Sequence, residues 1–307
     1  MILGIDAGGT KTRAIVMNKN GDIIYRGTGG PGNHFVVGEE GVIKALTTAL
    51  SKYEGPEFDI AIISAAGAGF SAESRAYIIN LSKKAIKAKK IDAYNDCYVA
   101  LRGAIATRKK GMIILAGTGS MVIGMDEEKM YHKTGGWGHL LGDEGSGYRI
   151  SYDAIRAVMK FWDGIGPYTP LVDGLIKYFK VHSVDDVIEL FYAKKVKRNQ
   201  VAAFSPNVIN IARRGDFIAE GIVRKNIQKL LSGVGSVKMR INDDYVSYAG
   251  GMFNSSYYKN VVKEELKIMG FELNEPILSP IGGALFMGFS ELGLLNDKIM
   301  EKLKKIK

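Results

Sequence analysis

The chain has 307 residues, 46% of them hydrophobic and 24% charged, which is typical of a globular protein and long enough for two domains with separate cores. The net charge is +10, but many lysines lie in short helical clusters that we interpret as solvated faces, so we expect no nucleic-acid partner. No apolar run reaches the ~18–20 residues needed to span a bilayer, and the lone cysteine, Cys97, excludes an intrachain disulfide framework. We therefore expect a cytoplasmic protein without a membrane partner.

The first hundred residues alternate between strand and helix patterns. In chain order the expected elements are strands over 2–5, 13–17 and 23–26, a helix over 42–53, a strand over 58–63, a helix over 72–87, a strand over 91–94 and a helix over 96–106. Three strands followed by alternating helices and strands indicate a layered α/β domain.

The same order then restarts, with long helices inserted in the second copy. The expected elements are strands over 112–115, 121–125 and 129–132, helices over 143–162, 169–180, 184–192, 199–214 and 216–238, a strand over 245–248, and helices over 255–269, 282–293 and 295–306. This duplicated β-β-β-α-β-α unit predicts two α/β domains, 1–106 and 107–294, with a ligand in the cleft between them. The terminal segment 295–307 is free to pack back on the first domain.

Two glycine-rich turns about 110 residues apart are the most informative feature. Residues 4–12 read Gly-Ile-Asp-Ala-Gly-Gly-Thr-Lys-Thr, and 116–120 read Ala-Gly-Thr-Gly-Ser, each between strand-like segments. Neither matches the common phosphate loops, which open a helix. Because glycine lets backbone amides approach an anion closely, the pair predicts that one nucleotide's phosphates bind both turns, with Thr10 and Thr118 contributing hydroxyls. Two ordinary glycine hairpins are the alternative.

Two carboxylates lie where phosphoryl transfer needs them. Asp6 ends the first strand beside the first turn, where a metal role through water competes with a structural one. Asp96 follows a strand and begins a helix, so it is either a general base or, like Asn95, a helix N-cap.

The segment Gly-Gly-Trp-Gly-His-Leu-Leu-Gly-Asp-Glu-Gly-Ser, residues 135–146, is the most specific motif. Five glycines in twelve residues fix an unusual backbone, and its polar and aromatic side chains suit contacts with a sugar. Two of these side chains also have structural interpretations, His139 as a local hydrogen-bonding residue and Trp137 as a cap on the core of the loop.

This motif resembles the signature of N-acetylglucosamine kinases and of the related BadF-BadG-BcrA-BcrD ATPase family, which includes activators of benzoyl-CoA and hydroxyacyl-CoA reductases. Further segments that match the family in order are 6–12, 32–34, 95–96, 116–120, 249–251 and 280–284. The resemblance covers essentially the whole chain and implies duplicated actin-like ATPase (ribonuclease H-like) domains around a cleft.

The resemblance also implies ATP and Mg²⁺ as cofactors and assigns residues to roles. It makes Asp96 the general base and gives Asp6 a contact to the metal through water. Residues assigned to ATP are Gly8, Gly9, Thr10, Lys11, Thr118, Gly250 and Gly251. Residues assigned to the sugar are Asn33, Asp96, Gly119, Ser120, Gly136, Trp137, Gly138, His139, Leu140 and Asp143.

We therefore expect an ATP-dependent carbohydrate kinase, and a homodimer, acting on a primary hydroxyl of a small sugar or sugar acid. N-acetylglucosamine and a 2-keto-3-deoxy sugar acid (2-dehydro-3-deoxygluconate) are the leading candidates. Residues 64–69 and Phe35 depart from the animal N-acetylglucosamine kinases near the expected acetamido side, which leaves that preference open. An activator of a radical dehydratase or reductase is disfavoured, because two copies of Cys97 supply two of the four thiolates that a [4Fe–4S] cluster needs. A non-catalytic sugar sensor would need a DNA-binding module, which we do not find before the first strand.

Overall fold

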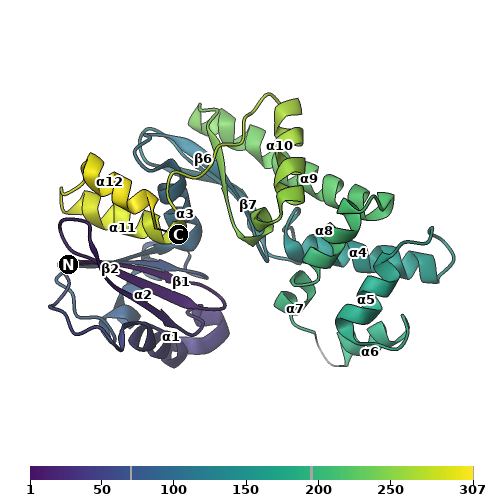
Figure 1. Ribbon diagram of the computed structural model, residues 1–307, viewed down its shortest axis with the longest axis horizontal. Helices are drawn as coiled ribbons and strands as arrows, with labels where there is room; N and C mark the ends of the chain where they lie inside the picture. Colours follow the sequence, from purple (N-terminus) through teal and green to yellow (C-terminus); the bar gives the residue numbers. More distant parts are fainter. Residues whose placement is uncertain (70, 194–195, 307) are drawn as a thin grey trace. The chain divides into compact units, whose positions relative to one another are not determined.

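The computed structural model describes residues 1–69, 71–193 and 196–306, so residue 307, the end of the expected terminal segment, lies outside the described residues. The chain forms two compact units, Met1–Arg108 with Glu275–Lys307, and Lys109–Asn274 (Figure 1). In the described residues, no helix is long and apolar enough to cross a membrane.

The first unit is built on a five-stranded sheet in the order β3-β2-β1-β4-β5. Its strands are β1 (Ile2–Ala7), β2 (Thr12–Met17), β3 (Ile23–Gly29), β4 (Ile60–Ala65) and β5 (Ile91–Asn95). β1 is antiparallel to β2 but parallel to β4, and β4 is parallel to β5. The carboxyl ends of three parallel strands therefore meet at one edge of the sheet, the usual place for a ligand in α/β folds.

Helices cover both faces of this sheet. They are α1 (His34–Leu50), α2 (Ala72–Lys83), α3 (Asp96–Ile105), α11 (Pro280–Glu291) and α12 (Asp297–Lys304). Alternate residues of β1 and β4 point to opposite faces: Ile2 and Ile60 join the core under α11, whereas Leu3 and Ala61 join the core under α1 and α2. The result is a three-layer α/β unit.

The second unit repeats this plan with four strands in the order β8-β7-β6-β9. Its strands are β6 (Gly111–Ala116), β7 (Ser120–Met125), β8 (Tyr131–Gly135) and β9 (Val246–Ala249). β6 is antiparallel to β7 and parallel to β9, as β1 is to β2 and β4. The predicted duplication of an α/β unit is confirmed.

The helical insertion lies between β8 and β9, followed by a short 3₁₀ turn and one more helix. These elements are α4 (Gly147–Trp162), α5 (Leu171–Phe179), α6 (Asp186–Tyr192), α7 (Arg198–Ala202), α8 (Ser205–Arg213), α9 (Phe217–Ile241), η1 (Gly251–Asn254) and α10 (Ser256–Ile268). Their apolar faces share one core with β6 and β7.

The helix expected over 42–53 is α1, which begins earlier, at His34, where Asn33 is the N-cap. Beyond shifts of a few residues at other element ends, the structure differs from the predictions at three further places. The helix expected over 199–214 is two helices, α7 and α8, because Pro206 lies in the first turn of α8 and a proline is not tolerated in a helix interior. The helix expected from 143 begins at Gly147, where Ser146 is the N-cap. The third difference concerns the domain boundary: α11, placed by us in the second domain, packs on α3, β1 and β4 of the first unit.

Candidate functional site

The first glycine turn joins β1 to β2, as expected of a strand–turn–strand hairpin. The Gly8 backbone N–H donates to the Lys11 carbonyl at 3.0 Å and closes the turn. Thr10 and Lys11 are exposed, and a Cβ atom added to Gly9 would meet open space. The turn therefore presents backbone and hydroxyl groups on a surface that an anion can approach.

Asp6 lies at the end of β1 beside this turn and forms an ion pair that the sequence did not indicate to us. Arg13, its partner across the β1–β2 ladder, places Nη2 2.8 Å from Asp6 Oδ2. The only sequence signal is their opposite position in the hairpin. In the described residues, Asp6 Oδ1 has no hydrogen bond to protein.

Asp96 is the first residue of α3, directly after β5. The question of which residue caps the helix is answered by Asn95, whose side chain accepts a hydrogen bond from the Cys97 backbone N–H at 2.9 Å. Burial raises the pKa of the Asp96 carboxyl, and the charge of Asp6 raises it further, while hydrogen bonds from the backbone N–H and the thiol of Cys97 oppose the shift. A raised pKa brings a carboxylate closer to the value that suits a general base near neutral pH.

The loop after β4 connects Asn33 with the Asn95–Asp96 corner. Asn95 donates from its amide to the Ala68 carbonyl, and Asn33 caps α1 by accepting from the Phe35 backbone N–H at 3.0 Å. Gly67 has a φ of 83°, and a Cβ there would lie 2.6 Å from Asn33 Oδ1 and 3.0 Å from the Phe35 ring. The two departures noted in the sequence, residues 64–69 and Phe35, are therefore in contact with each other.

In the second unit, Asp143 is the most buried of the predicted sugar residues, with 3% of its surface exposed. Its Oδ1 accepts from the Ser120 backbone N–H at 3.4 Å, and its Oδ2 lies 2.6 Å from Arg198 Nη2. A Cβ on Gly119 would lie only 2.5 Å from the same guanidinium. Sequence reasoning missed Arg198, which lies 55 residues away at the start of α7.

The 135–146 motif is held from three sides by hydrogen bonds to its backbone. Ser120 Oγ donates to the Glu144 carbonyl at 2.6 Å, Asn226 Oδ1 accepts from the Gly145 N–H at 3.3 Å, and the buried Tyr258 hydroxyl donates to the Gly145 carbonyl at 2.8 Å. Asp143 itself has a φ of 66°, a conformation that Asp tolerates better than most residues. The loop therefore presents its carboxylate from a fixed backbone.

The other residues of the motif divide into packed and exposed members. The His139 ring packs edge-on against Tyr148 with ring centroids 4.9 Å apart, which fits its structural interpretation. Trp137 is 67% exposed, and Lys133 Nζ lies 4.2 Å from its ring centroid. Leu140 is exposed as well, so Trp137 and Leu140 have surface free for a ligand, whereas Gly136 and Gly138 adopt positive φ that L-residues avoid.

The second glycine turn lies beside the tandem glycines that follow β9. The Gly117 N–H donates to the Gly119 carbonyl at 2.9 Å, leaving Thr118 exposed at the tip. Gly250 has a φ of 108°, and a Cβ on it would overlap the Ala116 carbonyl. Since β6 and β9 are parallel, this edge is again the carboxyl end of parallel strands.

Each unit thus collects part of the predicted site at one sheet edge. In the first unit these residues are Asp6, Gly8, Gly9, Thr10, Lys11, Asn33 and Asp96, and in the second they are Thr118, Gly119, Ser120, Gly136, Trp137, Gly138, His139, Leu140, Asp143, Gly250 and Gly251. Among the described residues, no group of three or more His, Cys, Asp or Glu side chains could hold a metal ion by itself.

Comparison with known proteins decides the family. The sequence model of the BadF/BadG/BcrA/BcrD ATPase family matches residues 3–288. The chain belongs to this family. Over 84% of its length it is 30% identical to an N-acetylmuramic acid/N-acetylglucosamine kinase of Clostridium acetobutylicum, covering 87% of that protein. Over 80% of its length it is 30% identical to an N-acetyl-D-glucosamine kinase of Dictyostelium discoideum, covering 81% of that protein.

A solved structure supports the fold assignment independently. The structure of a candidate N-acetylglucosamine kinase from Chromobacterium violaceum superposes with a TM-score of 0.75 at 21% identity, covering 93% of this chain and 98% of that one. The predicted family and the duplicated actin-like ATPase fold are both confirmed.

Proposed function

We propose that this ATP-dependent carbohydrate kinase transfers the γ-phosphate of ATP to a primary hydroxyl of an amino sugar, with N-acetylglucosamine as the leading acceptor. The observation that carries the proposal is Asp96, a half-buried carboxylate with a raised pKa beside Asp6, at the sheet edge that holds the first glycine turn. The Clostridium and Dictyostelium relatives are named as kinases of amino sugars. No relative reported above is named for a 2-keto-3-deoxy sugar acid, so that candidate is not carried forward.

Asp96 acts as the general base in this proposal. As the primary hydroxyl oxygen forms its bond to the γ-phosphorus, the bond from that phosphorus to the β-phosphate oxygen breaks, ADP leaves, and the hydroxyl proton moves to the Asp96 carboxylate. The raised pKa favours this transfer, because a carboxyl group with its ordinary value of about 4 is a weak acceptor at neutral pH.

Glycine turns supply the phosphate contacts. Gly8, Gly9, Thr10 and Lys11 in the first unit and Thr118 in the second would bind phosphate oxygens, and the tandem glycines Gly250 and Gly251 would approach the adenosine. Mg²⁺ fits this site as an ion that keeps several waters and shares its ligands with phosphates, because Asp6 Oδ1 is available for a water contact. When bound, the ion would neutralise phosphate charge.

Sugar recognition falls to the polar residues. Asn33 is held in place as the cap of α1, and Asp143 is held by Arg198 and by the Ser120 N–H, so both present oxygens from fixed positions. A second candidate acceptor is an amino sugar that carries a carboxylate. It is favoured by Arg198, a cation next to Asp143 whose side chain remains 39% exposed.

The test is a panel of acceptors with ATP and Mg²⁺, measured by coupled ADP release. The panel comprises N-acetylglucosamine, N-acetylmuramic acid, glucosamine, glucose and 2-dehydro-3-deoxygluconate. We expect the highest kcat/KM with N-acetylglucosamine. A higher value with N-acetylmuramic acid that falls in Arg198→Ala would support the second candidate, and turnover of none of the amino sugars would refute both.

A further inference from the structure

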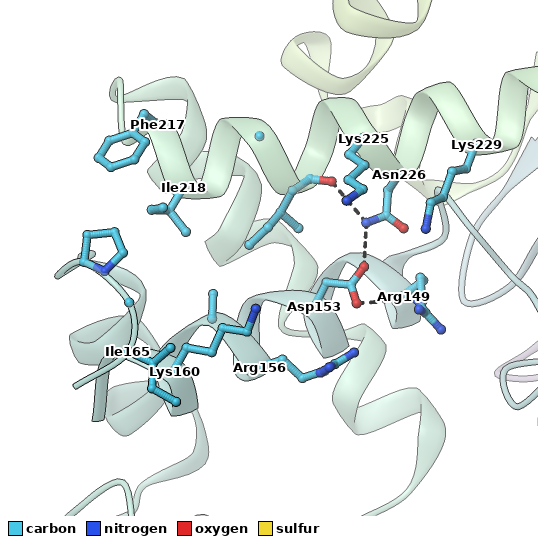
Figure 2. A pocket seen from close by; sticks show the side chains of 15 residues that line it. Arg149, Asp153, Arg156, Lys160, Ile165, Phe217, Ile218, Lys225, Asn226 and Lys229 are labelled. Carbon is cyan, nitrogen blue, oxygen red and sulfur yellow. Dashed lines mark hydrogen bonds and ion pairs between the residues drawn. The ribbon is translucent and has the colours of Figure 1, made fainter. Parts of the chain in front are cut away.

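A pocket of about 670 Å³ lies between α4 and α9, wholly within the second unit (Figure 2). None of the residues assigned above to ATP, sugar or metal lines it. Its volume is within the range of pockets that bind small molecules. Its lining is unequal in charge, with five cationic side chains and one carboxylate. The cations are Arg149, Arg156, Lys160, Lys225 and Lys229.

The single carboxylate, Asp153, already has partners within the pocket that compensate its negative charge. Asn226 donates its amide to Asp153 Oδ2 at 2.9 Å, and Arg149 Nε lies 3.5 Å from Asp153 Oδ1, as the dashed lines in Figure 2 mark. In the part of the chain that the structure describes, Lys225 and Lys229 have no ion-pair partner. They stand four residues apart on α9, a spacing at which like charges repel. An anion in the pocket would relieve this repulsion.

The opposite end of the pocket carries several apolar side chains, with Lys160 beside them. Figure 2 shows Ile165, Phe217 and Ile218 at the end away from Lys225 and Lys229. Phe217 is 67% exposed, so a large ring lies open at this end. A ligand that fits both ends has an anionic group at one end and an apolar or aromatic group at the other.

One residue of the pocket also contacts the 135–146 motif. Asn226 donates to Asp153 inside the pocket, while its Oδ1 accepts from the Gly145 N–H, two residues after Asp143. The same side chain thus bonds to a pocket wall and to the motif backbone. A ligand that moves Asp153 or Asn226 would change the hydrogen bond that holds the motif.

We propose that this pocket binds a small organic phosphate with an apolar or aromatic group, and that its occupancy is communicated to the 135–146 motif through Asn226. The phosphate lies among Lys225, Lys229 and Arg149, and the apolar group contacts Phe217. Ligand binding in the pocket does not depend on the proposed function. Only the idea that a change in the 135–146 motif alters sugar binding rests on the proposed function.

Calorimetric titration with phenyl phosphate and with inorganic phosphate tests the binding step. An excess of N-acetylglucosamine and a non-hydrolysable ATP analogue is kept present, so that the proposed catalytic residues are occupied. We expect phenyl phosphate to bind more tightly than inorganic phosphate, and Phe217→Ala to remove that difference. The double variant Lys225→Ala/Lys229→Ala should weaken phenyl phosphate binding about tenfold or more, since hydrogen bonds to charged groups are lost.

The matched control is Lys263→Ala/Lys267→Ala, which removes two exposed lysines with the same four-residue spacing from α10, outside the pocket. Its affinity for phenyl phosphate should stay within about twofold of the unaltered protein. Equal weakening of phenyl phosphate binding in both double variants, or unchanged binding in both, would refute this pocket as the binding site.

Sedimentation with phosphatidylcholine vesicles containing phosphatidic acid distinguishes a lipid headgroup from a free phosphate as the ligand. Binding that depends on Lys225 and Lys229 and occurs only on vesicles would refute a small-molecule ligand.

Hydrogen exchange tests whether a ligand in the pocket alters the 135–146 motif through Asn226. Phenyl phosphate should slow exchange of the Gly145 amide in the unaltered protein and leave it unchanged in Lys225→Ala/Lys229→Ala. An unchanged Gly145 amide at saturating phenyl phosphate would refute the connection through Asn226. Because this readout needs no turnover, it fails or succeeds separately from the kinase assay.

Discussion

Asp96, the proposed general base, also lowers the stability of the folded state when its carboxyl is ionised. Since burial raises the pKa of this carboxyl, its protonated form is favoured in the folded state. Its contribution to stability is therefore fully present below the ordinary carboxyl value of about 3.9 and is lost as the pH rises through the folded value. Ionisation of this carboxyl in the folded state therefore works against its own desolvation, as is common for groups at functional sites.

Asp96→Asn should lower kcat by ~10²–10⁴ because shape is kept and only the proton acceptor is lost. The same variant should unfold at a higher temperature than the unaltered protein at pH 7.5, with the difference shrinking at pH 4, because the neutral amide has no charge to desolvate. Thermal unfolding at the two pH values, together with ADP release, measures both effects. A variant that keeps half of its activity would contradict the general-base role of Asp96. A variant that is less stable than the unaltered protein at pH 7.5 would contradict the desolvation argument.

For Asp143, the ion pair with Arg198 predicts that substitution weakens the binding of the sugar but not of ATP. Asp143→Asn keeps the volume and tolerates the φ of 66°, but it leaves Arg198 without its charge partner and removes an acceptor for sugar hydroxyls. We expect the KM for the sugar to rise about tenfold or more while the KM for ATP changes less than about threefold. Initial-rate kinetics with each substrate varied in turn provide the comparison. A parallel rise in both constants would point to a general loss of structure.

Single residues were predictable where they stand at strand ends. Asp6 lies near the end of β1 and Asp96 at the junction of β5 and α3, where the sequence placed them, whereas their catalytic and metal-binding roles stay predictions. Arg13 and Arg198 could not, because ion-pair partners are chosen by the folded chain: Arg198 lies on an insertion helix 55 residues from Asp143. The burial that shifts the pKa of Asp96 is likewise a property of the packed unit.

At the scale of elements, strands and glycine turns followed from period and composition, whereas helix ends depended on local chemistry. The pattern over 199–214 has helical spacing throughout, yet Pro206 starts a new helix there. The helix expected at 143 begins only after the Ser146 cap, because Asp143 and Gly145 adopt positive φ. Caps and positive φ are set by contacts of the motif with β7 and α9.

Tandem glycines after β9 offer a matched pair of variants. A Cβ on Gly250 would overlap the Ala116 carbonyl and force an alanine to a φ of 108°, whereas a Cβ on Gly251 meets open space. Gly250→Ala should lower the free energy of unfolding by ~1–3 kcal/mol, the usual range for strained backbone, and should raise the KM for ATP. Gly251→Ala should change stability by less than about 1 kcal/mol. Urea unfolding of the two variants makes the comparison, and equal destabilisation would contradict the strain argument.

At the scale of the whole molecule, the terminal segment lies on the first unit, as the sequence suggested, but sequence order did not reveal which sheet α11 covers. The segment after β9 continues the second repeat, so the sequence pattern predicts residues 275–294 in the second domain. In the structure, α11 is buried on several sides and packs in the first unit, with Leu285 close to Gly4 of β1. An apolar helix fits either sheet by its pattern, and only the packing partners distinguish them.

This arrangement makes the first unit discontinuous and predicts how fragments will fold. One face of its sheet, including Ile2, Ile60 and Ile62, is covered by a core that Leu285, Phe289 and other residues of α11 and α12 complete. Without residues 275–307 this apolar face would be exposed to water, which is strongly unfavourable. Residues 109–274 instead form a continuous unit with a core of their own.

We therefore expect a fragment of residues 109–274 to unfold cooperatively in urea, and a fragment of residues 1–108 to lack a cooperative transition, although 108 residues is an ordinary length for a domain. Adding a peptide of residues 275–307 should restore the transition in the 1–108 fragment, because it returns α11 and α12 to the uncovered sheet face. Circular dichroism during urea titration follows both fragments. Cooperative unfolding of residues 1–108 alone would show that α1, α2 and α3 suffice to stabilise the sheet, and that α11 and α12 are dispensable for the first unit.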